Sequence, residues 1–313
     1  MNLFEAFKKL LSPHNSYVGI DIGTSSIKLV EIEERRGKLR LASYGELSLG
    51  LYKEGGFSGQ IVSFEDDCIK KAIADILHET HVTSRDAGIS ISAPSALIVN
   101  LTIPQTTEKI VDSIVMTEMR KYVPIPLTEL SIDWWPLPLP SAITNGGKKD
   151  TVPVMVAALR KERMSRYQEI AKDLNFTSLF YEIEIFSSAR AVFEHDLSSI
   201  AIVDFGASSI KVSLLQYGVI RKYSQIKKGS YYLTDQLSKV FELSWTEAED
   251  FKKNFGILHS SREEKQTSFL ETQTGLLLDE LLSILQSYEK ESDRKSTRLD
   301  SSHGGISRMP SSA

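Results

Sequence analysis

Two short segments of the sequence carry acidic, glycine, hydroxyl and lysine residues in the same order. The first is Asp21-Ile-Gly-Thr-Ser-Ser-Ile-Lys28, and the second is Asp204-Phe-Gly-Ala-Ser-Ser-Ile-Lys211. The carboxylates could hold a hydrated divalent cation, and the glycine and hydroxyl residues that follow suit phosphate oxygens. One copy alone is typical of a surface turn, but two copies far apart in the chain indicate two related halves.

These segments predict a polyphosphate site between two facing halves. We expect Asp21 and Asp204 to position the metal ion and the rest of each segment to contact the phosphates. The predicted contacts in the two segments are Asp21, Gly23, Thr24, Ser25, Ser26, Lys28, Asp204, Gly206, Ser208, Ser209 and Lys211.

The elements around both segments have the pattern of a strand, a tight turn and a second strand. Apolar runs at residues 17–20 and 27–30 flank the first segment, and runs at 200–203 and 210–214 flank the second. Further strands are predicted at 39–47 and 87–92, with an amphipathic helix at 68–77 between them. This alternation predicts a layered α/β domain.

The middle of the chain has a different order of elements. Its predicted order is a strand at 97–103, a helix at 107–122, a strand at 130–135, a loop and a strand at 152–157. Trp134 and Trp135 are predicted to pack in the core of this part, with a partner-facing pair as the alternative. The elements predicted after it are a helix at 161–174, a strand at 179–183, a helix beginning at Glu184, and helices at 235–241, 245–252 and 276–288.

On these residues the chain resembles the actin-like ATPases, whose two phosphate-binding hairpins have this Asp-x-Gly form. Within that superfamily it resembles the PilM family of type IV pilus assembly proteins, relatives of the division protein FtsA, from about residue 17 to about 291. Further support comes from Arg120-Lys-Tyr-Val-Pro-Ile-Pro-Leu127 with Asp133, and from Glu184-Ile-Phe-Ser-Ser-Ala189. The resemblance implies an α/β, actin-like ATPase fold of two related RNase H-like halves with a small FtsA/PilM-type inserted subdomain.

The resemblance and the sequence pattern at the two ends together give the expected domain limits. The expected parts are an amphipathic N-terminal segment (1–16), a first half (17–92), the insert (93–160), an incomplete second half (161–292) and a non-native tail (293–313).

ATP and Mg²⁺ are the ligands that the resemblance implies. Glu184 would lie opposite the terminal phosphate and orient water or act as a weak base, although a carboxylate there is also a good helix cap. Gly229 is expected among the nucleotide contacts. Glu249 and Lys252 would approach the adenosine, with a charged outer helix face as the alternative. Hydrolysis is expected to be slow or incidental.

The resemblance further implies a cytoplasmic scaffold, peripheral to the inner membrane, that docks the cytoplasmic tail of a PilN-like membrane protein. The tail is expected to lie along the insert, between about Leu97 and Val156. Self-association is a further expectation. Two other functions stay open at this point: an FtsA-like division filament and a small-molecule kinase of the same superfamily.

Composition excludes several other classes. A formal net charge of −4 with mixed cations and anions predicts no nucleic-acid partner, and Cys68, the only cysteine, excludes an internal disulfide. No apolar stretch approaches the ~20 residues that span a bilayer, so we expect no transmembrane segment. Leu3, Phe4 and Phe7 lie on one face of a short predicted helix that could touch a membrane surface or fold onto its own domain.

The last part of the sequence, from Asp293 to Ala313, lacks apolar periodicity. It is either a disordered terminus or, as we expect, the translation of a sequencing-library adapter, in which case the natural gene continues beyond Ser292. Gly304-Gly305 then only imitates the adenosine motif of the superfamily, because no apolar strand precedes it.

Overall fold

The computed structural model describes residues 15–137, 151–192, 199–216, 218–257 and 264–301, without the side chains of 15, 178 and 291–301. The chain forms two compact units, Met1–Asp250 and Phe251–Ala313, and each is described by itself. The expectations for the N-terminal segment 1–16, for the loop at 138–150 and for residues 302–313 fall almost wholly outside the described residues.

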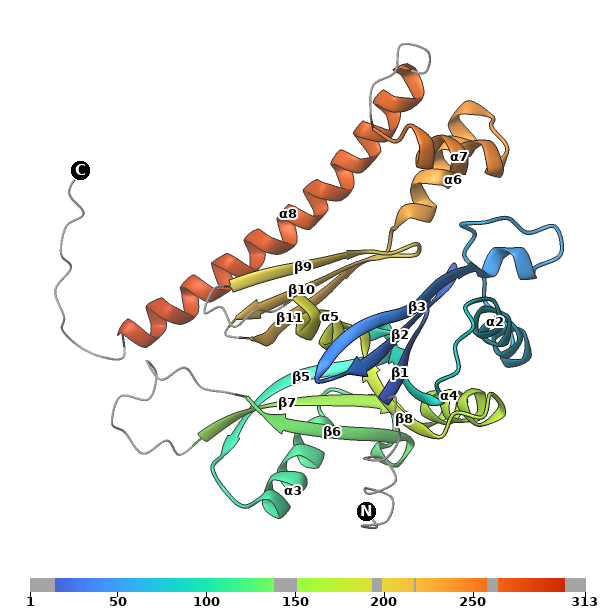
Figure 1. Cartoon of the computed structure of the whole chain (residues 1–313). Coiled ribbons are helices and arrows are strands. Elements are labelled where there is room, and N and C mark those ends of the chain that lie inside the picture. Colours follow the sequence, from blue (N-terminus) through green and yellow to red (C-terminus); the bar gives the residue numbers. More distant parts are fainter. Residues whose placement is uncertain (1–14, 138–150, 193–198, 217, 258–263, 302–313) are drawn as a thin grey trace. The chain divides into compact units, whose positions relative to one another are not determined.

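A five-stranded sheet forms the first half of the first unit (Figure 1). Its order is β3-β2-β1-β4-β8, with antiparallel pairing from β1 to β3 and parallel pairing of β1 with β4 and of β4 with β8. The strands are β1 (Asn15–Ile22), β2 (Ser26–Arg35), β3 (Lys38–Ser48), β4 (Asp86–Ile91) and β8 (Ser178–Ile183).

Two helices, α2 (Asp66–Glu79) and α4 (Lys161–Asp173), cover one face of this sheet. Alternating residues of the strands point toward these helices, and Ile27, Leu29 and Ile73 are fully buried between the layers. The opposite face includes Tyr17, Val30 and Ile32, which are partly exposed. The core of this half therefore lies on the helix-covered side of the sheet.

The insert is an antiparallel sheet of order β5-β7-β6 with one helix against it. Its elements are β5 (Ala96–Pro104), α3 (Glu108–Met119), β6 (Leu130–Pro136) and β7 (Thr151–Arg160). Val111, Val115 and Met119 of α3 pack into the core of the insert.

The paired tryptophans of β6 point to opposite sides of the insert sheet, as neighbours on a strand do. Trp134 packs with the α3 side, where its indole N–H donates to Asp112 at 2.7 Å. Trp135 packs on the other side, edge to face with Phe186 at a ring distance of 5.2 Å. Trp134 thus packs in the core of the insert, as predicted, whereas Trp135 packs outside it, in the core that the insert shares with α5.

The second half within this unit contains the antiparallel sheet β11-β10-β9. Its strands are β9 (Ser199–Phe205), β10 (Ile210–Gln216) and β11 (Val219–Ile226), and α5 (Glu184–Val192) precedes them in the chain. A shared core joins all three sheets: Ile91 and Ile183 come from the first sheet, Met155 from the insert and Leu215 from β10. The three sheets are thus packed around α5.

The helices after β11 are α6 (Ser230–Phe241), α7 (Trp245–Asn254) and α8 (Glu264–Ser301). Two of them differ from the sequence expectation. The first begins at Ser230 rather than Asp235, because Leu233 is buried with Leu237 one turn later. The last, α8, begins at Glu264 instead of Leu276 and extends to Ser301, since residues such as Glu, Lys, Leu and Arg propagate a helix once it has started.

Candidate functional site

The two repeated segments form equivalent β-hairpin turns. The backbone N–H of Gly23 donates to the carbonyl of Ser26 at 3.0 Å, and that of Gly206 donates to Ser209 at 3.0 Å. A Cβ at Gly23 would lie 2.8 Å from the Ser26 oxygen, and one at Gly206 would lie 3.0 Å from that of Ser209. Glycine is therefore required in the first turn and favoured in the second by the close approach of the backbone.

Different neighbours hold the two turns in place. In the first, the N–H groups of Leu49 and Val62 donate to the carbonyls of Ser25 and Thr24 at 2.8 and 3.0 Å. In the second, the N–H of Ser230, at the start of α6, donates to the carbonyl of Gly206 at 3.0 Å. A Cβ on Gly229 would lie 2.4 Å from that same oxygen. Gly229 thus packs directly against the backbone of the second turn.

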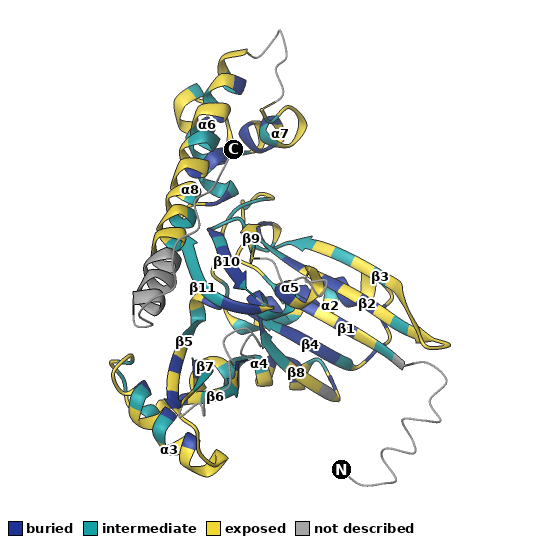
Figure 2. Cartoon of the chain, turned by 90° about the vertical axis from the view of Figure 1, so that its left-hand side faces the viewer, coloured by how far each residue is buried: buried dark blue, intermediate teal, exposed yellow. Residues whose placement is uncertain are grey.

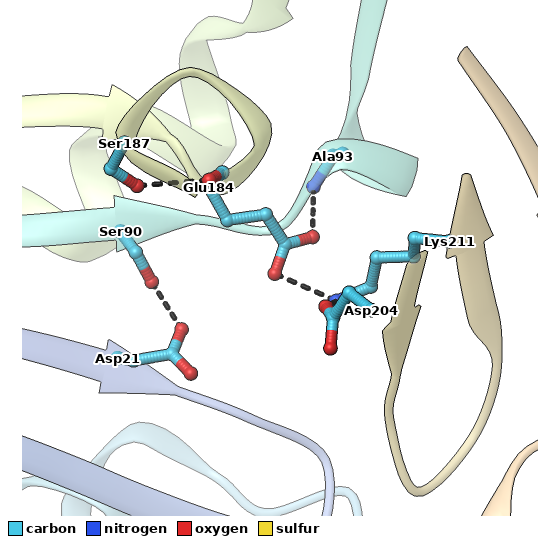
Figure 3. A network of polar contacts seen from close by, with 7 residues as sticks. All are labelled: Asp21, Ser90, Ala93, Glu184, Ser187, Asp204 and Lys211. Carbon is cyan, nitrogen blue, oxygen red and sulfur yellow. Dashed lines mark hydrogen bonds and ion pairs between the residues drawn. The ribbon is translucent and has the colours of Figure 1, made fainter. Parts of the chain in front are cut away.

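The acidic and basic ends of each segment face each other across the hairpin. Asp21 is the register partner of Lys28 in the first hairpin, and Asp204 is the partner of Lys211 in the second. Asp21 accepts a hydrogen bond from Ser90 of β4 (Figure 3). Each hairpin thereby presents one carboxylate and one ammonium group beside its turn.

Glu184, the first residue of α5, lies between the halves (Figure 3). One of its carboxylate oxygens accepts the N–H of Ala93 at 2.7 Å, and the other accepts the Lys211 ammonium at 2.7 Å. Lys211 also donates to Asp204 at 3.1 Å. Burial lowers the pKa of Lys211, but the hydrogen bond to Glu184 and the charges of Glu184 and Asp204 together raise it above its usual value.

A phenol lies close to this group of charges. Burial, followed by the charge of Glu184, raises the pKa of Tyr223 to about 12, with Lys211 acting in the opposite direction. Nothing in the motif pattern of the sequence pointed to Tyr223.

A cavity of about 370 Å³ brings most of the predicted site residues together. Its lining includes Asp21, Gly23, Thr24, Ser25, Ser26, Lys28, Glu184, Asp204, Gly206, Ser208, Ser209 and Lys211. Gly229 is not one of the lining residues, although it packs against Gly206 and Ala207, which are. Glu249 is buried and accepts a hydrogen bond from Thr234 at 2.6 Å, outside this lining. Lys252 lies in the second unit.

Sequence reasoning missed two arginines in the same cavity, Arg163 and Arg166 of α4. Arg166 forms an ion pair with Asp66, and one of its nitrogens donates to the Phe64 carbonyl at 3.1 Å. Arg163 is exposed and, among the described residues, has no ion-pair partner. The only sequence signal was their spacing on one helix, which does not distinguish a site from an outer face.

A second cavity, of about 490 Å³, lies between the insert and the first sheet. Its apolar wall includes Trp135, Met164 and Phe186, and Asp133 adds a carboxylate. At two places in the chain, consecutive residues line different cavities. Ile91 and Ile183 line the second cavity, and the residues that follow them, Ser92 and Glu184, line the first.

A third hollow, of about 270 Å³, lies on the face of the first sheet that α2 and α4 leave open. Gly19 and Gly88 form its floor and Phe180 borders it. A Cβ on Gly88 would lie 2.2 Å from the Phe180 ring, so this ring covers the glycine.

No group of three or more His, Cys, Asp or Glu side chains that could hold a metal ion occurs among the described residues. A Mg²⁺ ion needs fewer protein ligands, because it usually keeps several waters and shares substrate phosphates. Asp21 and Asp204 therefore fit a phosphate-bound magnesium ion but not a metal cage built from protein alone.

Two turn-forming hairpins around one cavity, carried by two related halves, define the class: the chain has the actin-like ATPase fold. The sequence profile of the family described as "Type IV pilus assembly protein PilM" matches residues 19–301. The chain therefore belongs to the PilM family of type IV pilus assembly proteins.

One solved structure supports this fold. A chain of a "PilM-PilN type IV pilus biogenesis complex" is 20% identical, with a TM-score of 0.67, and the match covers 86% of this chain and 77% of that one. MreB 5 of Spiroplasma citri bound to AMPPNP is 10% identical over 87% of this chain and 78% of that one, with a TM-score of 0.46. No helix among the described residues has the length and apolar character needed to cross a membrane.

Proposed function

We propose that this chain is an ATP-binding scaffold of type IV pilus assembly that docks the cytoplasmic tail of a PilN-like inner-membrane protein. The observation that carries the nucleotide part is the placement of both repeated hairpin turns and Glu184 around one cavity. Membership of the PilM family supports the role in pilus assembly.

The charges of the cavity suit a magnesium-bound polyphosphate. Lys28, Arg163, Arg166 and Lys211 are its basic residues, and Asp21, Glu184 and Asp204 are its acidic ones. A bound Mg²⁺ would neutralise phosphate charge and attract Asp21 and Asp204. Thr24, Ser25, Ser208 and Ser209 would supply hydroxyl groups to phosphate oxygens, and both hairpins would grip the ligand from opposite sides.

The hydrogen bonds of Glu184 in this arrangement make it a weak general base. Both of its carboxylate oxygens accept hydrogen bonds, one from Ala93 and one from Lys211. Its role is then to position Lys211 and a water molecule, which accords with slow or incidental hydrolysis. A scaffold that uses the nucleotide to set its domain geometry needs no rapid turnover.

The second cavity is the proposed seat of the peptide. Its lining offers two kinds of contact to a peptide. Trp135, Met164 and Phe186 offer apolar contacts, and Asp133 can pair with a cation. Part of its wall belongs to β6 and β7 of the insert, the region in which the tail was expected. We infer that the partner tail carries apolar side chains and at least one Lys or Arg.

A crossed experiment tests both parts. Calorimetry with Mg-ATP should show affinity lowered by at least about tenfold in Asp204→Asn and unchanged in Ser131→Trp, in which an exposed residue of the second cavity becomes bulky. Fluorescence anisotropy with a labelled PilN-like tail peptide, at fixed saturating Mg-ATP, should show loss of binding in Ser131→Trp.

Each half of the proposal can fail separately. Unchanged Mg-ATP affinity in both Asp21→Asn and Asp204→Asn would exclude the two-hairpin site. Equal peptide affinity in wild type and Ser131→Trp would place the groove elsewhere.

A further inference from the structure

The end of the β2–β3 hairpin combines basic and apolar side chains on an exposed projection. Residues 35–41 read Arg-Arg-Gly-Lys-Leu-Arg-Leu and contain four cations and no acidic side chain, in a chain whose formal net charge is −4. All seven residues are exposed, and Figure 2 shows this end of the hairpin in yellow. Glu33 and Glu34 precede this run, and Arg35 forms an ion pair with Glu33 at 2.8 Å. The local excess of positive charge therefore comes mainly from Arg36, Lys38 and Arg40.

The hairpin holds these side chains in a defined arrangement. Its turn is tight, with Arg36 and Gly37 at φ of 54° and 73°, and the strands pair up to Arg35 and Lys38. Leu39 and Leu41 are 74% and 55% exposed, and Tyr44 is 72% exposed. Neighbouring residues of a strand point to opposite faces, so the leucines project from one face and Lys38 and Arg40 from the other.

Leu39 and Leu41 belong to the open face of the first sheet. Leu41 is the register partner of Ile32, which in turn faces Tyr17 on β1, and both are partly exposed. The apolar surface therefore continues from the tip of the hairpin into the sheet. Exposed apolar surface of this kind, bordered by cations, marks an interaction site.

We propose that the β2–β3 hairpin tip is a contact site for an anionic phospholipid surface. With the tip end-on to the surface, Arg36, Lys38 and Arg40 would reach the headgroups from the turn and one face of the hairpin, and Leu39 and Leu41 on the other face would enter the interface between headgroups and acyl chains. A convex tip fits a broad, anionic surface with an apolar interior. It fits an acidic protein segment less well, because residues 35–41 line none of the three cavities described above.

Vesicle co-sedimentation of the whole chain tests this site without nucleotide or peptide, so its outcome is separate from that of the proposed function. Wild-type protein should bind vesicles of phosphatidylethanolamine and phosphatidylglycerol, bind more weakly as salt is raised, and fail to bind phosphatidylcholine vesicles. Replacing Arg35, Arg36, Lys38 and Arg40 by Gln should weaken binding at least about tenfold.

Matched controls separate the site from general charge and folding. Replacing four exposed lysines elsewhere, Lys53, Lys71, Lys109 and Lys172, by Gln removes the same charge and should weaken binding much less. Leu39→Ser should weaken binding severalfold, and Leu51→Ser, at a residue 65% exposed, should not. Circular dichroism should show every variant folded.

Three results would overturn the proposal. The first is no vesicle binding by the wild-type chain. The second is equal binding by the hairpin and control variants, which would point to another contact such as residues 1–14. The third is an acidic protein that the wild-type chain binds and the hairpin variant does not, when neither chain binds vesicles.

Discussion

The ammonium of Lys211 lies 2.7 Å from one carboxylate oxygen of Glu184, which joins β10 of the second hairpin to the first residue of α5. Both side chains are 15% exposed, so the pair is shielded from solvent. Lys28, the equivalent lysine of the first hairpin, is exposed and, among the described residues, has no such partner. Two segments of nearly identical sequence thus have different electrostatic roles.

Removing Lys211 should destabilise the fold. In Lys211→Met the carboxylate of Glu184 keeps its burial but loses its cation, and such a loss typically costs about 1–3 kcal/mol. Lys28→Met is the matched control and should change the free energy of unfolding by less than about 0.5 kcal/mol. Urea unfolding measures both; equal values for the two variants would show that the ion pair contributes nothing.

The same pair predicts a pH dependence. The pKa of Lys211 is raised in the folded state, so its stabilising contribution is complete below the unfolded value of 10.5. As pH rises above that value, the unfolded state releases the proton first and the contribution is lost on passing through the folded pKa. The difference in unfolding free energy between wild type and Lys211→Met should therefore shrink above pH 10.5. A difference that stays constant or grows across this range contradicts the assignment.

Gly229→Ala should disturb the second hairpin. The new methyl group would lie 2.4 Å from the carbonyl oxygens of Gly206 and Ala207, and relieving that contact should cost about 1–3 kcal/mol. Gly275→Ala is the control, because a Cβ there meets no neighbouring atom and alanine favours the helix by about 0.5–1 kcal/mol. Thermal melts should move in opposite directions for the two variants, and a melt of Gly229→Ala at the wild-type temperature would rule out the close contact.

Trp135→Ala should destabilise the protein by about 2–4 kcal/mol, since it removes the edge-to-face contact with Phe186 and opens a gap in the core shared by the three sheets. Tyr44→Ala, at a side chain 72% exposed, should cost less than about 1 kcal/mol. Chemical denaturation compares the two, and similar costs would mean that Trp135 is not part of that core.

The hairpins and the insert were predictable because local periodicity and glycine or proline mark them. The start of α5 is marked by apolar spacing alone, since residues 178–192 contain neither glycine nor proline. The actin-like fold was confirmed, and so was membership of the PilM family. Arg163 could not be assigned from sequence, since its place in the cavity depends on how α4 packs against the first sheet. Glu249 was equally ambiguous: its charge suggested a surface, but the hydroxyl of Thr234 satisfies it in a buried position.

Consecutive residues line different cavities at two points in the chain: Ile91 and Ile183 line the second cavity, and Ser92 and Glu184 line the first. This limits what genetics can resolve. A selection for loss of pili that returns Ile91 or Ile183 substitutions will not reveal which cavity failed, because the neighbouring residue is displaced along with the one that changed. Asp133 lines only the second of these two cavities and Asp204 only the first. Comparing mutants of these two residues can therefore assign a phenotype to one cavity or the other.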